Sequence, residues 1–210
     1  MALRGDGRWA AAAVFTLTVV QLAVAATMPG LEQFAGKGFT ARLVAYPVMM
    51  LAAPAVWWLL ARRGRTPPGT TGAAERPRPV PWIPFTWIML PFLIDVTGNT
   101  LDLYDSIWWW DDANHLVNWF FLNLGVGLLL AGVTPQPGWA LLVMVSGLGA
   151  MMAIGWEIGE YFAFIRGGTE LATAYTDTLG DLTLGTLGAL AAGTLVAWGH
   201  RTPRATRMKR

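Results

Sequence analysis

The sequence predicts an all-α, polytopic membrane protein in which about six transmembrane helices form a bundle. Hydrophobic residues make up 54% of the 210-residue chain and charged residues only 13%, far below the roughly 25% charge that is typical of soluble domains. Long uncharged runs recur along the chain, each close to the roughly 20 residues that a helix needs to cross a bilayer. Basic and acidic residues also occupy different segments, which indicates cytoplasmic basic loops.

The distribution of charge predicts the orientation of these helices. Twelve of the fifteen Lys and Arg residues lie near the N-terminus, in residues 62–78 and at the C-terminus, whereas ten of the thirteen acidic residues lie between Asp95 and Asp181. By the positive-inside rule, both termini and the 62–80 loop are expected to be cytoplasmic. Nucleic-acid binding is disfavoured, because the basic residues lie in tails and a Pro-rich loop. The chain has no cysteine, so neither a disulfide nor a thiolate metal ligand can form.

The first half of the chain contains two predicted spans, residues 9–28 and 43–61. The first also resembles a signal peptide, because Arg4 and Arg8 precede it and Ala23 and Ala25 are spaced like a cleavage site. Cleavage would leave the orientation of the later helices unchanged. Residues 28–42, with Pro29 and several glycines, are predicted to form a loop without chemistry. Residues 62–80, rich in Arg, Pro and Gly, are predicted to be a flexible cytoplasmic loop within a single integral membrane domain, residues 1–210.

Four further spans are predicted over residues 82–101, 115–133, 139–164 and 182–198. Counting residues along each helix places its acidic groups near the outer membrane surface. In the last span, Gly185 and Gly188 are expected to lie against another helix, because residues without bulky side chains allow close approach.

One stretch, residues 95–115, concentrates polar groups between two of these spans. Asp95, Asn99 and Asp102 fall at positions i, i+4 and i+7, so a helix would carry them on one face. Asp111 and Asp112 precede His115 by four and three residues, so they can also share a face with it. Ionisable groups in membrane segments are costly and suggest a functional site.

Later segments supply further carboxylates, in the pairs Glu157 with Glu160 and Asp177 with Asp181. Carboxylates gathered together need a cation or a shared proton. Carboxylate oxygens suit Mg and Ca, and imidazole suits Zn, Mn and Fe, so a divalent metal ion is the expected cofactor. The candidate catalytic residues are Asp95, Asp102, His115, Glu157, Glu160 and Asp181. The candidate metal ligands are His115, Glu157, Glu160, Asp177 and Asp181.

A purely structural interpretation competes with this one. Asp111, Asp112 and Asp177 are each typical of acidic residues near helix N-termini, where they cap the helix and favour its dipole. That account is weaker for Glu157 and Glu160, because they lie near a helix C-terminus, where the dipole disfavours negative charge.

The order of these motifs resembles that of the small bacterial membrane proteins related to YjdF and, more distantly, the VanZ-like proteins. It consists of Asp112-x-x-His115, then Glu157-x-x-Glu160, then Asp177-x-x-x-Asp181 leading into a helix with Gly188. Gly185 stands where VanZ-like proteins often have Asn, which favours the YjdF-like branch. The resemblance implies a bacterial cytoplasmic-membrane protein and implies no established reaction. The VanZ-like link to glycopeptide resistance would point to the cell envelope.

Three functions fit the pattern. The first is a metal-dependent enzyme acting on an envelope lipid or its phosphate headgroup. The second is a non-enzymatic binding or assembly protein with a structural ion site. The third is a proton-coupled carrier in which Asp95, Asp102 and His115 relay charge. It is less favoured, because the inner halves of the later helices are almost wholly apolar. The lipid bilayer is the expected environment in all three.

Overall fold

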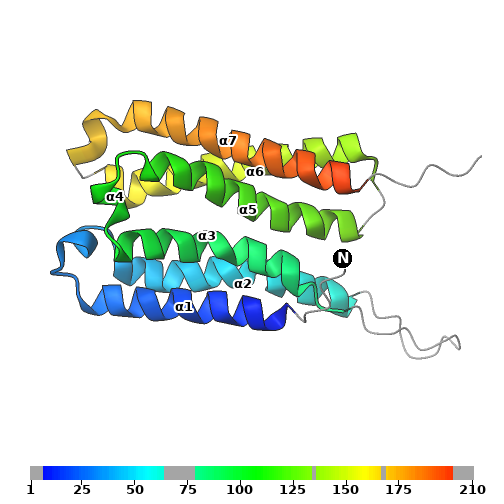
Figure 1. Ribbon diagram of the computed structural model, residues 1–210, viewed down its shortest axis with the longest axis horizontal. Helices are drawn as coiled ribbons and strands as arrows, with labels where there is room; N and C mark the ends of the chain where they lie inside the picture. The colour runs from blue at the N-terminus through cyan, green and yellow to red at the C-terminus, as the bar shows by residue number, and fades with distance from the viewer. Residues whose placement is uncertain (1–6, 64–78, 134–135, 167–168, 201–210) are drawn as a thin grey trace, which may run out of the picture. The chain divides into compact units, whose positions relative to one another are not determined.

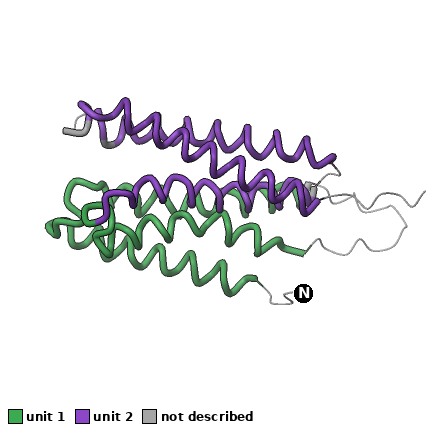
Figure 2. Tube along the Cα trace, turned by 45° about the horizontal axis from the view of Figure 1, so that its top comes forward, with its two compact units in different colours: residues 1–106 green, residues 107–210 purple. Residues whose placement is uncertain are grey.

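The computed structural model describes residues 7–63, 79–133, 136–166 and 169–200, and these are helical, without a strand. The chain divides into two compact units, residues 1–106 and 107–210 (Figure 2). Most of the segment between residues 62 and 80, together with the two tails, lies outside the described residues, so the predicted flexible loop and the single-domain organisation stay predictions.

Unit 1 is built from three long helices (Figure 1). Helix α1 (Arg8–Thr27) packs against both α2 (Phe39–Arg63) and α3 (Trp82–Thr100). The short helices η1 (Glu32–Phe34) and α4 (Leu103–Ser106) complete the unit at the ends of α1 and α3. Leu22, Met50 and Phe85, from the three long helices in turn, are almost completely buried, so apolar side chains from all three form the core.

Unit 2 also contains three long helices. These are α5 (Trp110–Val133), α6 (Gly138–Glu160) and α7 (Ala174–Gly199), with a π-helical turn, η2 (Tyr161–Ile165), and a short η3 (Thr169–Ala172) between the last two. Helix α7 packs along both α5 and α6. The beginning of α5, the end of α6 and the beginning of α7 therefore lie at the same end of the unit (Figure 1).

Glycines allow α7 to approach α5 closely, as the sequence predicts for Gly185 and Gly188. A Cβ added to Gly188 would collide with the carbonyl oxygen of Leu116, and one added to Gly185 would lie 2.8 Å from Cδ1 of Trp119. Only residues without a side chain permit such backbone contact between membrane helices. The prediction that both glycines lie against another helix is confirmed.

Five helices are long and apolar enough to cross a membrane: Arg8–Thr27, Phe39–Arg62, Trp110–Gly132, Gly138–Ala163 and Ala174–Gly199. The membrane helix bundle is therefore confirmed, with five candidate spans among the described residues instead of about six. The predicted span at residues 82–101 does form a helix, α3, but it is not among the five. Its last turns carry Asp95, Asn99 and three further Thr or Gly residues, and these reduce its apolar character.

Three helices begin earlier than predicted. Helix α2 begins at Phe39, α5 at Trp110 and α7 at Ala174, whereas residues 43, 115 and 182 were expected. Asp111 and Asp112 lie in the first turn of α5 and Asp177 in that of α7, where the helix dipole favours negative charge. As a result, Arg42, Asp111 and Asp181 lie within helices, and the prediction that residues 28–42 form a loop is wrong for its last four residues.

The expected single face for Asp95, Asn99 and Asp102 is wrong for Asp102. Helix α3 ends at Thr100, and Asp102 lies in the following turn with φ 58°. Aspartate tolerates this left-handed conformation better than most residues. The Asp102 carbonyl oxygen accepts hydrogen bonds from the backbone N–H and the hydroxyl of Ser106, so it supports α4.

Candidate functional site

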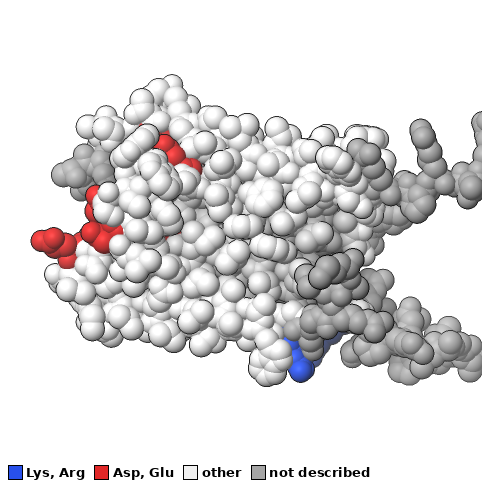
Figure 3. All heavy atoms as spheres, in the orientation of Figure 1, with Lys and Arg blue, Asp and Glu red and all other residues white. Residues whose placement is uncertain are grey.

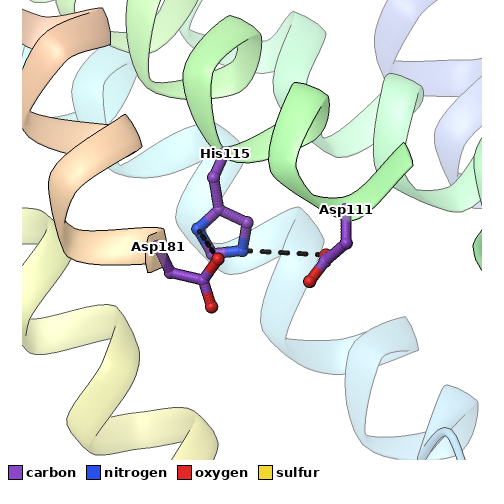
Figure 4. Close-up of side chains that lie close together, drawn as sticks. All are labelled: Asp111, His115 and Asp181. Atoms are coloured by element: carbon purple, nitrogen blue, oxygen red, sulfur yellow. Dashed lines mark ion pairs between the residues drawn. The ribbon is translucent and has the colours of Figure 1, made fainter. Parts of the chain in front are cut away.

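Asp111, His115 and Asp181 come together in unit 2. His115 Nδ1 lies 3.4 Å from Oδ1 of Asp181, and His115 Nε2 lies 3.8 Å from Oδ1 of Asp111. One ligand atom from each of the three residues lies within 4.8 Å of the others. The imidazole is thus placed between two carboxylates from different helices (Figure 4).

The two helices bring these groups together by simple periodicity. Asp111 and His115 are four residues apart on α5, so they share one face of that helix. Asp181 lies four residues before Gly185 and seven before Gly188 on α7, so it lies on the face through which α7 meets α5. The close glycine contact therefore brings the Asp181 carboxylate to the imidazole.

A second buried carboxylate, that of Glu157 on α6, lies near this group. Glu157 is hydrogen-bonded to the side chain of Thr178 and interacts electrostatically with Asp111 and Asp177. Asp181 in turn interacts with Asp111, Asp177, Glu157 and Glu160. Both Asp181 and Glu157 are buried, at 4% and 7% exposure, so several like charges surround two groups that solvent barely reaches.

Basic residues are almost missing from this part of the chain. Between residues 107 and 200, the sequence contains one Lys or Arg, Arg166. Arg166 is exposed, and its guanidinium carbon lies 5.9 Å from the centre of the Phe162 ring. Carboxylates in such surroundings need protons or a cation from outside the unit.

Two carboxylates and one imidazole form a donor set that suits Zn, Mn or Fe. Of the predicted metal ligands, His115 and Asp181 belong to this group. Glu157, Glu160 and Asp177 lie within electrostatic range of Asp181 but outside the group of three. Asp111 belongs to the group but not to the predicted ligands, because the sequence interpretation makes it a helix cap. Its i,i+4 spacing from His115 is the signal in the sequence that indicates its place in the group.

Asp95, the other deeply placed acid, has a different environment in unit 1. Its Oδ2 accepts hydrogen bonds from Tyr46 Oη at 2.6 Å and from Arg42 Nη1 at 3.1 Å, and its Oδ1 accepts one from Tyr104 Oη at 2.8 Å. None of these three partners is predicted from the sequence. The i,i+4 spacing of Arg42 and Tyr46 places these two on one face of α2, but no spacing along the chain relates them or Tyr104 to Asp95.

In Figure 3, the Asp and Glu side chains on the visible face lie at helix ends, and uncharged side chains cover the stretches between them. This agrees with the many large apolar side chains that are exposed along the helices of each unit. Within unit 2, the acids cluster where α5 and α7 begin and α6 ends. The catalytic and ligand roles assigned from the sequence stay predictions.

The sequence matches DUF2238, a family of predicted membrane proteins, over residues 9–202. Because the match covers nearly the whole chain, the protein belongs to this family. The membership supports a membrane location, and the resemblance to YjdF-related proteins is consistent with it. The VanZ-like resemblance stays a prediction. No curated protein and no solved structure matches the chain.

Proposed function

We propose that this DUF2238 protein binds a divalent metal ion at Asp111, His115 and Asp181, and that the ion serves a reaction on a phosphate group at the membrane surface. The observation that carries the proposal is the approach of the three ligand atoms to within 4.8 Å, from two helices and beside further carboxylates. An ion here would offset the mutual repulsion of those carboxylates.

The residues around the group suit this role. Glu157 lies outside the three ligands, and its hydrogen bond with Thr178 orients its carboxylate, so Glu157 is our candidate for accepting a proton during the reaction. Glu160 and Asp177 lie nearby and add negative charge that favours a divalent over a monovalent cation. A bound metal ion would supply Lewis-acid polarisation of a phosphate oxygen.

A structural ion site without a reaction is the second candidate, because the same three side chains join α5 to α7. A carrier is less well supported. The Trp119 ring is buried and packs against Gly185, one turn beyond His115 and Asp181. Beyond this contact α5 and α7 carry no ionisable side chain, although the amide of Asn123 is buried one turn further along α5. A carrier would need polar groups to continue through that level.

Metal analysis of the purified protein tests the proposal. We expect about one equivalent of a divalent metal after gentle purification, and loss of that metal in Asp181→Asn and His115→Ala. Asp112→Asn is the matched control, because Asp112 is an exposed acid in the same first turn of α5 that does not belong to the group. If metal-free protein shows no change with added Zn, Mn, Mg or Ca, the metal site is wrong and shared protons explain the carboxylates.

The same variants separate the two candidates. If the ion is structural, Asp181→Asn and His115→Ala should unfold at a lower temperature than the metal-loaded wild type. Any loss of function in cells should then be no greater than the loss of folded protein. A catalytic ion predicts that they fold and reach the membrane but fail to replace the wild type in cells. Glu157→Gln distinguishes the two candidates further. If Glu157 accepts a proton and does not bind the metal, its loss should abolish activity while the protein retains the metal.

We further propose that the protein lies in the bacterial cytoplasmic membrane with both termini in the cytoplasm and the acidic helix ends outside. The separation of basic from acidic residues supports this orientation. Ser106 is exposed in α4, and the chain has no natural cysteine. A cysteine introduced at Ser106 should react with an impermeant reagent in intact cells. Reaction only after permeabilisation would show that the orientation is wrong. It would also contradict the proposal that α3 crosses the membrane as a sixth span.

A further inference from the structure

Unit 2 has exposed aromatic residues at both ends of two of its helices. Trp139 at the beginning of α6 and Tyr161 in η2, directly after its end, are 71% and 41% exposed, and on α7, Tyr175 and Trp198 are 77% and 66% exposed. The residues of each pair are 22 and 23 positions apart, which corresponds to about 33 and 35 Å along a helix. This matches a hydrocarbon core of roughly 30 Å. Tyr and Trp are enriched at both membrane surfaces, so these pairs mark the two surfaces on unit 2.

The candidate metal group lies just inside one of these surfaces. Asp181 is six residues beyond Tyr175, or about 9 Å along α7, and His115 is five residues beyond Trp110, where α5 begins, or about 8 Å. Glu157 is four residues before Tyr161, or about 6 Å. Three helices therefore agree that the group lies beneath the headgroup layer, close to where the phosphates and acyl chains of the lipids meet.

The group is open on one side and closed on the other. Side-chain exposure falls from 49% for Asp111 to 12% for His115 and 6% for Asp181, and the Trp119 ring against Gly185 closes the inner side. The open side is therefore at the helix ends. Trp108, Phe162 and Tyr175 belong to the residues at these helix ends, and all three are highly exposed, so apolar and interfacial surface surrounds the entrance.

We propose, on the premise of the metal site above, that its ligand is the phosphate of a lipid in the same leaflet and not a soluble phosphate ester. A soluble phosphate would have to leave water and approach a strongly acidic group. A lipid phosphate is already held at this depth by its acyl chains, which raises its effective concentration at the site. The bound ion would attract a soluble phosphate and a lipid phosphate alike. The depth of the site below the membrane surface is therefore what favours the lipid phosphate.

The test uses the full-length protein in nanodiscs of a phosphate-free galactolipid, with the affinity for Mn²⁺ as the readout. Mn²⁺ is titrated first in these galactolipid nanodiscs. It is then titrated in nanodiscs that contain a minor fraction of phosphatidic acid or the same fraction of an anionic sulfolipid. In a fourth titration, the galactolipid nanodiscs are supplied with millimolar glycerol 3-phosphate in the buffer. Because binding at linked sites is reciprocal, a ligand of the ion raises the affinity for the ion. We expect about a tenfold increase with phosphatidic acid, and none in Asp181→Asn.

The controls separate the possible failures. An equal increase with sulfolipid would mean that surface charge merely concentrates Mn²⁺, and an equal increase with glycerol 3-phosphate would mean that the ligand is soluble. Either result, or no increase with any phosphate while Mn²⁺ still binds, overturns the lipid inference and leaves the metal site standing. If Mn²⁺ does not bind in any nanodisc, the proposed function itself is wrong.

Discussion

Asp95 in unit 1 and Asp181 in unit 2 are both aspartates within long helices of a membrane protein, yet their surroundings differ in charge. Asp95 receives hydrogen bonds from one guanidinium and two phenols of its own unit. Asp181 faces an imidazole and interacts with four other carboxylates. The difference lies less in the two aspartates than in the side chains that pack beside them from other helices.

The contrast separates a structural role from a binding role. A buried carboxylate that is paired and hydrogen-bonded has its charge compensated within the fold, and removing a partner leaves that charge uncompensated. A carboxylate among like charges lacks such compensation and favours a cation or proton. We therefore infer that Asp95 holds α2, α3 and α4 together, whereas Asp181 contributes to a site for something that the chain does not supply.

The largest expected effect comes from breaking the contact that brings Asp181 to His115. Gly188→Ala should destabilise the protein by about 3 kcal/mol, because the added methyl group meets the backbone of Leu116 and cannot be relieved by a rotamer change. Thermal unfolding in detergent measures this. Gly147→Ala on α6 is the control, since its Cβ would meet nothing within 4 Å. Equal stability of the two variants would show that α5 and α7 are not in close contact.

Neutralising the two aspartates should have opposite consequences. Asp95→Asn should cost about 2 kcal/mol, because charge-assisted hydrogen bonds to Arg42 and the two tyrosines are weakened. Asp181→Asn in the presence of a chelator should be neutral or stabilising, because it removes one of several like charges. Denaturation with and without Mn²⁺ checks both. If Asp181→Asn in chelator is as unstable as Asp95→Asn, the two aspartates are equivalent and the comparison fails.

A double-mutant cycle would measure the Arg42 contribution by itself. Arg42→Ala alone should destabilise by about 2 kcal/mol, and much less when Asp95 is already Asn, with a coupling of about 1.5 kcal/mol. Denaturant titration of the four proteins gives this number. A coupling near zero would mean that the two tyrosines alone compensate Asp95.

The smallest expected effect is at the surface of unit 1. Lys37 Nζ lies 2.6 Å from Oδ2 of Asp105, but the Asp105 side chain is 56% exposed. Exposed ion pairs contribute at most about 1 kcal/mol, so Lys37→Ala should change the unfolding temperature little and should lose its effect in high salt. A loss as large as that of Arg42→Ala would show that exposure does not distinguish the two pairs.

The sequence by itself determined the helical class and the position of most helices. It also determined that the acids of unit 2 lie together at one end of its helices. It could do so because apolar length and charge distribution act locally along the chain. The predicted glycine contact followed from the same kind of local rule, since small residues permit close helix packing.

Only the tertiary structure decided which acid meets which partner. Arg42 and Asp95 are 53 residues apart, and His115 and Asp181 are 66 residues apart, so no periodicity along one helix relates them. Arg42 and Asp181 lie within α2 and α7, and each has its charged partner on another helix, Asp95 on α3 and His115 on α5. A carboxylate is compensated or left to bind a cation according to what packs beside it, and packing between distant segments is a property of the folded chain.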